Sequence, residues 1–326
     1  MLGFNGLQLP EWLRQFEARF GLGGVILFDY DLSTQCHGRN VQSPEQVRQL
    51  CQSIARMKSK PLVFVDQEGG HVRRLKEETG FAPLPAAKEF SALPLAQKEE
   101  LARTSFQEMR GLGIHYNLAP VADLEVNPES PDIGSLGRAF SGKPEQVREN
   151  VRLLNRIAGE VGLGLCLKHY PGLGSATINT HRNLTPLPHL QPEETALFHE
   201  LGAEINGSAV LVSHGIVDRW EPGVPVSISS VAIGHLREHL PDVLLISDDF
   251  QMEGLRDYAG TGHACEKGLA AGLDLLLIGN NLINEERRAK RIAERLSQKL
   301  IDEPALAQKA RQAYARIQSR KQRFAV

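Results

Sequence analysis

The feature that most constrains the fold is a series of short, almost uninterrupted runs of Val, Ile and Leu. They lack polar alternation, which predicts strands buried on both faces of a parallel sheet. The clearest runs are 24–28 (GVILF), 61–65 (PLVFV), 164–168 (GLCLK), 209–213 (AVLVS), 243–247 (VLLIS) and 274–278 (DLLLI), and weaker candidates are 2–9 and 115–121. Segments with helical periodicity lie between them, chiefly 44–57, 95–111, 144–161 and 192–205.

Alternating strands and helices of this number predict an α/β fold, a (β/α)8 TIM-type barrel, with a doubly wound open sheet as the alternative. No Gly/Pro/Ser-rich linker divides the 326 residues, so we expect one domain over 1–326. The segment from about 285 to 324 is rich in Arg, Lys, Gln and Ala at helical spacing. It predicts a solvated pair of amphipathic helices, with a nucleic-acid or partner surface as the alternative.

The charge balance and the cysteines narrow the classes of partner and compartment. Lys and Arg number 37 against 39 Asp and Glu, so no global field attracts nucleic acid or an anionic membrane. The first 20 residues show no secretion-signal pattern, and no apolar run reaches the roughly 20 residues needed to cross a bilayer. The four scattered cysteines predict free thiols. We therefore expect a cytoplasmic protein that binds neither nucleic acid nor membrane.

Polar residues follow the predicted strands at the end where a barrel carries its active site. Burying a lone charge costs several kcal/mol, so charged strand ends indicate a site or a salt bridge. For Asp248 the alternative is a helix N-cap, which Asp249 could equally provide. For Lys168 the alternative is an ion pair with Asp66 or Asp123. The residues at these strand ends are Asp66, Asp123, Lys168, His169, His214, Asp248 and Asp249.

The loop that follows Lys168-His169 is rich in small residues. It has Gly172 and Gly174 but not the third glycine of a dinucleotide fingerprint, and no G-K-[ST] follows, so nucleotide binding is disfavoured. A mobile loop of this kind suits residues carried over a pocket, which makes Asn179 and His181 candidates. The alternative for His181 is an ordinary surface position. Arg138 is likewise either a site residue or an ordinary surface residue.

Two other hydrolytic chemistries lack their signatures. His169, His214 and Asp248 at strand ends suit metal-dependent barrels, but the H-x-H pair of the first strand is missing. The G-x-S-x-G elbow of a Ser-His-Asp hydrolase is also missing. We therefore expect neither a metal nor another cofactor.

Ordered motifs along the whole chain resemble one family. They are 23–28 (GGVILF), 65–70 (VDQEGG), 117–123 (NLAPVAD), 168–172 (KHYPG) and 246–249 (ISDD). In this order they resemble the barrel of glycoside hydrolase family 3, in its single-domain bacterial β-N-acetylglucosaminidase branch, which serves peptidoglycan recycling. The resemblance implies a retaining enzyme that removes terminal non-reducing N-acetylglucosamine from peptidoglycan-derived fragments.

The resemblance also implies residue roles. Asp248 matches the nucleophile that forms a covalent glycosyl-enzyme intermediate. His181 matches the loop histidine that serves this branch as acid/base, and imidazole can give and take a proton near neutral pH. Residues that match the contacts to the hydroxyls of the cleaved sugar are Asp66, Arg138, Lys168 and His169. Larger members take their acid/base from a second domain, which this chain has no length to supply.

The chain departs from the family pattern beside the acid/base. The branch has Asp-Ser-His where this chain has Asn179-Thr180-His181, Leu173 replaces a loop histidine, and His71 replaces an arginine. An Asn179 side chain can accept a hydrogen bond from imidazole but adds no charge to stabilise imidazolium. The equivalent Asp-to-Asn change in a serine protease triad costs about 10⁴ in kcat. A relative with altered specificity and a non-catalytic sugar-binding relative therefore remain alternatives, although a pure binder needs neither Asp248 nor His181. The leaving group, the acceptor and the oligomeric state stay open.

Overall fold

A computed structural model describes residues 1–180, 182–205, 209–283 and 286–324. In these residues a parallel sheet runs in the order β1-β4-β7-β8-β9-β10. Isolated parallel bridges close it into a ring, because Leu2 pairs with both Val25 and Ile278, and Leu275 pairs with Ile246. The (β/α)8 barrel is therefore confirmed. Its strands are β1 (Gly24–Leu27), β4 (Leu62–Val65), β7 (Tyr116–Asn117), β8 (Gly164–Tyr170), β9 (Ala209–Val212) and β10 (Leu244–Ser247).

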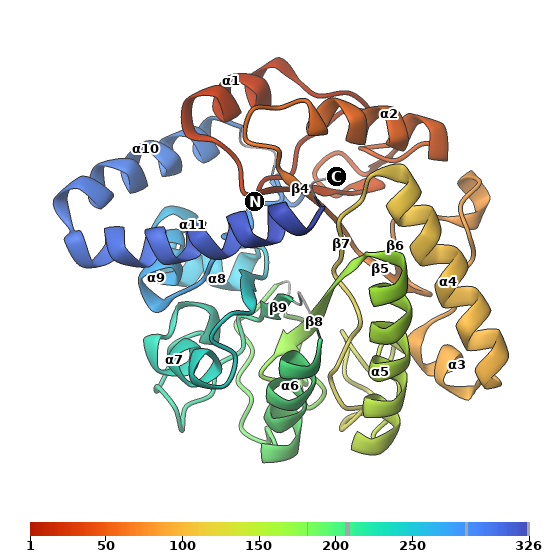
Figure 1. The fold of residues 1–326 in the computed structure, drawn as a ribbon. Coiled ribbons are helices and arrows are strands. Elements are labelled where there is room, and N and C mark those ends of the chain that lie inside the picture. The colour runs from red at the N-terminus through yellow and green to blue at the C-terminus, as the bar shows by residue number, and fades with distance from the viewer. Residues whose placement is uncertain (181, 206–208, 284–285, 325–326) are drawn as a thin grey trace.

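Helices surround the strands, as Figure 1 shows. Those of the outer ring are α1 (Glu11–Phe20), α2 (Pro44–Ala55), α4 (Leu95–Leu112), α5 (Pro144–Val161), α6 (Pro192–Glu204), α7 (Ser230–His239), α9 (Thr261–Ala271), α10 (Glu286–Asp302) and α11 (Pro304–Phe324). Shorter elements are α3 (Ala87–Ala92), α8 (Glu253–Ala259), the 3-10 turns Glu77–Thr79 and Val226–Ile228, and the hairpin strands β2 (Tyr30–Asp31), β3 (Cys36–His37), β5 (Gln67–Gly69) and β6 (Val72–Arg73).

Strand side chains alternate between two apolar layers. In β1 and β4, Ile26 and Phe64 belong to the cluster inside the barrel, whereas Val25 and Val65 belong to the cluster shared with the helices. Burial on both faces explains why the runs are continuously apolar. Gly164 is required where Tyr116 fills the interior, since a Cβ there would lie 2.4 Å from the tyrosine ring.

Local signals set the helix boundaries. The Ser43 side chain accepts a hydrogen bond from Gln46 N, with Pro44 in the first turn, so α2 starts where the sequence predicts. Helix α5 ends at Gly162, whose φ of 78° suits glycine. The basic C-terminal segment forms α10 and α11, which lie side by side on the outside of the barrel (Figure 1).

The chain start differs from the expected strand over 2–9. Only Leu2 bridges its neighbours. After it, Asn40 Nδ2 donates to the carbonyls of Phe4 and Gly6, and Gly6 has a φ of 120°. The last ladder hydrogen bond is donated by Gly3 N to the Ile278 carbonyl, and from Phe4 onward the Asn40 side chain takes the backbone carbonyls, so the strand ends early.

Candidate functional site

A cavity of about 310 Å³ opens at the carboxyl ends of the strands. Its wall brings together most of the described residues that the sequence singles out, from separate strands and loops, but not Asp123 or His214. Apolar side chains such as Phe28, Leu211 and Leu277 also line it. The predicted site residues in the wall are Asp66, Arg138, Lys168, His169, Asn179 and Asp248. Such convergence of charged groups on one cavity is the usual mark of a binding site.

Lys168, near the end of β8, lies between two carboxylates. Its Nζ is 2.7 Å from Asp66 Oδ1 and 2.5 Å from Glu68 Oε1. The Lys168 side chain is 3% exposed and that of Glu68 2%, so water screens this pair weakly. Burial alone lowers the pKa of Lys168, but the charges of Asp66 and Glu68 outweigh burial and raise it above the ordinary value. Lys168 is therefore a fixed cation.

Arg138 reaches the same carboxylate from the long loop after β7. Its Nε and Nη2 lie 2.8 Å from the two oxygens of Glu68, a bidentate pair, and its Nη1 donates to the Asp132 carbonyl at 2.6 Å. Burial alone raises the pKa of Glu68, yet the charges of Arg138 and Lys168 hold it well below its usual range. One buried carboxylate thus positions two cations.

The contacts of His169 fix its tautomer. Arg138 Nη2 lies 3.0 Å from His169 Nε2, and since a guanidinium can only donate, Nε2 accepts. The hydrogen is then on Nδ1, which donates to Asp123 Oδ2 at 2.7 Å. Asp123 also accepts from the backbone N–H of His169 and of Leu173. Asp123 therefore orients the imidazole and anchors the start of the following loop.

Asp66 is the more accessible carboxylate of this cluster, with its side chain 13% exposed. Besides Lys168, Arg74 contacts it at 3.3 Å. Burial alone raises the pKa of Asp66, but Lys168 and Arg74 outweigh this and lower it. Asp66 is an ionised acceptor at the cavity surface.

Asp248 and Asp249, directly after β10, have different surroundings. Asp248 is partly exposed in the cavity wall, and its Oδ1 accepts from Asp249 N at 2.8 Å. Asp249 is buried, and its Oδ1 accepts from the backbone N–H of Gln251 and Gly279. Burial, reinforced by the charge of Asp248, raises the pKa of Asp249 to about 7. Helix α8 starts only at Glu253 without a side-chain cap, so the N-cap interpretation of either aspartate is wrong.

The small-residue loop closes one side of the cavity. Asn179 and Thr180 line it, and Thr180 N donates to Asp132 Oδ2 at 2.6 Å. Asp132 thereby ties this loop to the segment that holds Arg138. His181 lies outside the described residues, so its predicted role stays a prediction.

His214 is a strand-end candidate that the structure places elsewhere. It is 5% exposed, its Nδ1 lies 2.7 Å from Ser227 Oγ, and its Nε2 lies 3.0 Å from the Asp249 carbonyl. Since a carbonyl only accepts, Nε2 donates and Nδ1 accepts from Ser227. These contacts give His214 a structural role below the cavity.

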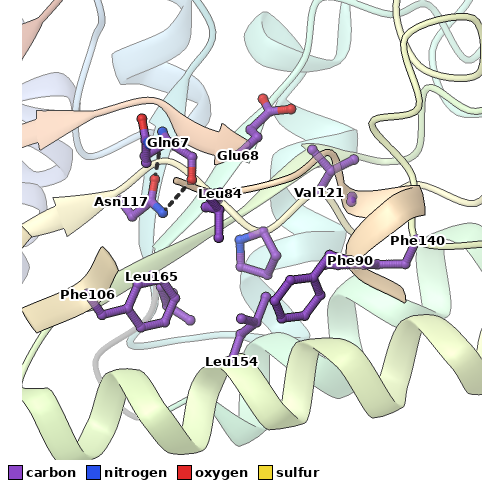
Figure 2. Close-up of a pocket in the computed structure, with 13 residues that line it drawn as sticks. Gln67, Glu68, Leu84, Phe90, Phe106, Asn117, Val121, Phe140, Leu154 and Leu165 are labelled. Carbon is purple, nitrogen blue, oxygen red and sulfur yellow. Dashed lines mark hydrogen bonds between the residues drawn. The ribbon is translucent and has the colours of Figure 1, made fainter. Parts of the chain in front are cut away.

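A second, smaller cavity of about 30 Å³ lies behind the site (Figure 2). Phe90, Phe106 and Phe140 line it, and Figure 2 shows the Glu68 carboxylate pointing away from these rings. The Asn117 side chain accepts from Gln67 N at 3.0 Å and donates to Gln67 O at 2.8 Å. This amide therefore fixes the backbone between Asp66 and Glu68. Apolar side chains pack behind this backbone, so the two carboxylates point toward the larger cavity.

Sequence reasoning missed the roles of Glu68, Asp123 and Asp132. Glu68 follows the same predicted strand as Asp66 and lies two residues after it. This spacing was the signal in the sequence that could have placed both carboxylates at one site. Asp123 was predicted as a strand-end residue and as an alternative ion-pair partner for Lys168, whereas its carboxylate contacts His169. Asp132 follows no strand and no local pattern marks it. In the described part of the chain no group of three or more His, Cys, Asp or Glu residues is arranged to hold a metal ion.

The chain is similar to curated and solved proteins along most of its length. A β-hexosaminidase of Pseudomonas aeruginosa is 30% identical over 294 residues, which is 88% of this chain and 83% of that protein. A β-hexosaminidase of Thioalkalivibrio sulfidiphilus is 30% identical over 334 residues, covering 98% of this chain and 89% of that protein.

Solved structures agree in fold. A glycoside hydrolase family 3 β-N-acetylglucosaminidase from Paenibacillus superimposes with a TM-score of 0.86 at 28% identity. The match covers 99% of this chain but 61% of that longer chain. A β-N-acetylhexosaminidase from Beutenbergia cavernae gives a TM-score of 0.84 at 23% identity, with 99% and 96% coverage. The family model described as the N-terminal domain of glycosyl hydrolase family 3 matches residues 10–317, and the chain therefore belongs to this family of glycoside hydrolases.

Proposed function

We propose that this chain is a retaining β-N-acetylglucosaminidase that releases terminal, non-reducing N-acetylglucosamine through a covalent intermediate on Asp248. The supporting observation is the contrast in one cavity between a partly exposed carboxylate, Asp248, and a wall of fixed charges at Asp66, Arg138 and Lys168. The names of the 30% identical relatives and of the Paenibacillus enzyme support the same activity and sugar.

The fixed charges suit sugar hydroxyl groups. Lys168 and Arg138 can only donate hydrogen bonds, and ionised Asp66 can only accept them, so each hydroxyl finds a partner of defined direction. Glu68 holds Lys168 and Arg138 in place before a ligand arrives, and Lys168 in turn holds Asp66. Little side-chain freedom is therefore lost on binding. This predicts strong discrimination between sugars that differ at one hydroxyl group.

The proposed reaction has two steps at the anomeric carbon. In the first, an Asp248 oxygen bonds to that carbon while the glycosidic bond breaks, and His181 gives its proton to the leaving oxygen. In the second, His181 takes a proton from water, whose oxygen bonds to the same carbon as the bond to Asp248 breaks. Two displacements on opposite faces return the β configuration.

We also propose that the substrates are peptidoglycan-derived fragments handled in the cytoplasm. All four cysteines, which lie within the described residues, are unpaired, and Cys51, Cys166 and Cys265 are buried thiols. Free thiols persist in reducing compartments. No described helix combines the length and apolar character of a membrane span.

A non-catalytic sugar-binding relative is the second candidate, because Asn179 stands where a carboxylate would support His181. The test compares hydrolysis of 4-nitrophenyl β-N-acetylglucosaminide and of the matched β-glucoside. The proposal expects turnover of the first that is lost in Asp248→Asn, with N-acetylglucosamine binding retained by calorimetry. Sugar binding by the wild type without turnover of either substrate establishes the second candidate.

A further inference from the structure

Glu194 is a buried acid that the proposed reaction does not use. It lies in the first turn of α6, which packs against β8, the strand that carries Lys168 and His169 (Figure 1). Glu194 is 1% exposed. Its Oε2 accepts from the backbone N–H of Gln191 at 2.9 Å, but its Oε1 is buried and has no hydrogen-bond partner among the described residues. Capping of α6 therefore accounts for one carboxyl oxygen and not for the other.

The unpartnered oxygen lies against the loop that follows β8. A Cβ on Gly172 would lie 3.1 Å from Glu194 Oε1, and a Cβ on Gly174 would lie 3.4 Å from it. The next residue of α6, Thr195, donates from its Oγ1 to the Pro171 carbonyl at 3.4 Å. The first turn of α6 therefore packs directly on the start of this loop, and the two glycines allow the close approach.

The Asp123 carboxylate holds the same short stretch of loop. Its Oδ1 accepts from Leu173 N at 2.9 Å, and its Oδ2 contacts His169 Nδ1 at 2.7 Å. Because Leu173 lies between the two glycines that meet Glu194, its backbone links the buried acid to Asp123. The position of this backbone therefore bears on the orientation of His169, which is proposed to contact the sugar.

The surroundings of Glu194 favour its neutral form. Burial, with smaller contributions from the charges of Asp123 and Glu193, raises the pKa of Glu194 to about 7, and the Gln191 N–H and the charge of Arg219 oppose this rise. A neutral acid can rest against the loop at small cost, whereas an ionised one needs hydrogen-bond donors that Oε1 does not have. Ionisation of Glu194 therefore disfavours the packing of the loop on α6.

We infer that Glu194 is a positioning residue of the sugar site, which acts through the loop backbone at 172–174 and through Asp123 to hold His169 in its binding orientation. The neutral acid keeps the loop packed on α6. When Glu194 ionises, the loop moves away from Oε1 and the hold of Asp123 on His169 weakens. Sugar binding and turnover therefore decline as the pH rises through about 7. The turnover part of this inference rests on the proposed function, whereas the binding part does not need hydrolysis.

The test follows two quantities in the full chain between pH 6 and 8.5. They are kcat/KM for 4-nitrophenyl β-N-acetylglucosaminide and, by calorimetry, the Kd of N-acetylglucosamine. Glu194→Gln introduces an amide that cannot ionise and whose oxygen can still accept from Gln191 N. Arg219→Gln removes an exposed cation that lowers the pKa of Glu194. The control is Glu145→Gln, which changes a first-turn glutamate of the neighbouring α5 whose side chain is 75% exposed.

Glu194→Gln and the wild type should be equal at pH 6, and the variant should exceed the wild type by about tenfold at pH 8, in kcat/KM and in sugar affinity. Glu145→Gln should follow the wild type at every pH. Arg219→Gln should move the decline to higher pH, which a merely structural role of Glu194 does not predict. This second variant decides the question even if Glu194→Gln does not fold.

A ratio between Glu194→Gln and the wild type that does not change with pH overturns the inference, and so does an unshifted decline in Arg219→Gln. The proposed hydrolysis can fail separately. Sugar affinity that depends on pH in the wild type but not in Glu194→Gln, without turnover by either, supports the inference and contradicts the hydrolysis. Turnover with a ratio independent of pH does the reverse, and absence of both turnover and sugar binding overturns both.

Discussion

Glu68 and Lys168 form a buried ion pair in the wall of the sugar cavity, with Lys168 Nζ 2.5 Å from Glu68 Oε1. The other oxygen of Glu68 is 2.8 Å from Arg138 Nε. Two cations proposed to bind the sugar thus depend on one carboxylate. Removing one partner of a buried pair leaves an uncompensated charge, which is far costlier than replacing the whole pair.

The first prediction concerns Glu68→Gln. The amide leaves Lys168 and Arg138 buried without their shared anion, so we expect the free energy of unfolding to fall by about 3–5 kcal/mol in urea titration at pH 7. Glu78→Gln is the control, because Glu78 meets Arg73 on the surface and its loss leaves stability unchanged. Equal stability of Glu68→Gln and the wild type would contradict a stabilising role for the ion pairs of Glu68 with Lys168 and Arg138.

The same variant has a predicted pH dependence. The pKa of Glu68 is depressed in the folded state, so its stabilisation is present above the ordinary value of 4.5 and is lost as the pH falls below it. The stability gap between the wild type and Glu68→Gln should therefore narrow below pH 4.5. A gap that stays constant down to acid unfolding contradicts the depressed pKa.

Asp249→Asn tests a pH dependence of stability with the opposite sign, because the pKa of Asp249 is raised whereas that of Glu68 is lowered. The folded-state pKa of Asp249 is about 7 against an ordinary 3.8, so the folded protein holds the extra proton between these values. Its contribution to stability is full below the ordinary value and is lost as the pH rises to about 7. Stability of the wild type relative to Asp249→Asn should fall by roughly 1.4 kcal/mol per pH unit across that window. In the variant, the amide oxygen of residue 249 can still accept from the backbone N–H of Gln251 and Gly279, so the fold is kept. Glu194, whose pKa is also raised to about 7, titrates in both proteins and cancels in the difference. A difference independent of pH between 4 and 7 refutes the raised pKa.

Asn179→Asp tests the predicted acid/base on the loop. A carboxylate there stabilises imidazolium at His181, so turnover of an aryl β-N-acetylglucosaminide should rise and its pH optimum should move upward. The measurement is kcat/KM across pH 5 to 9 for the wild type and the variant. Thr177→Ser, an exposed change in the same loop, is the control and should leave both unchanged. If Asn179→Asp leaves both rate and pH profile unchanged, residues 179 and 181 do not work as a pair.

The sequence predicts most of the barrel because burial on both faces leaves a direct signature. Runs such as 62–65 are apolar at every position since one set of side chains fills the interior and the other meets the helices. The N-terminal strand was overextended because the side-chain hydrogen bonds of Asn40 to Phe4 and Gly6 leave no apolar pattern.

The gathering of the site was also predictable in part. Asp66, Lys168, His169 and Asp248 meet because the carboxyl ends of parallel strands meet at one rim. The contact between Glu68 and Arg138 could not be predicted, because 70 residues separate them and Arg138 lies in an irregular loop. The bond from Thr180 to Asp132 joins two loops and has no periodic signal.

The anomeric configuration of the sugar as it is first released tests whether Asp248 forms a covalent intermediate. Hydrolysis of 4-nitrophenyl β-N-acetylglucosaminide by the wild type is followed by ¹H NMR from the first minutes, with Asp248→Asn as the inactive control. We predict that β-N-acetylglucosamine appears first, that the α-anomer follows only by mutarotation, and that Asp248→Asn releases neither. Release of the α-anomer first, or unchanged hydrolysis by Asp248→Asn, would contradict a covalent intermediate on Asp248.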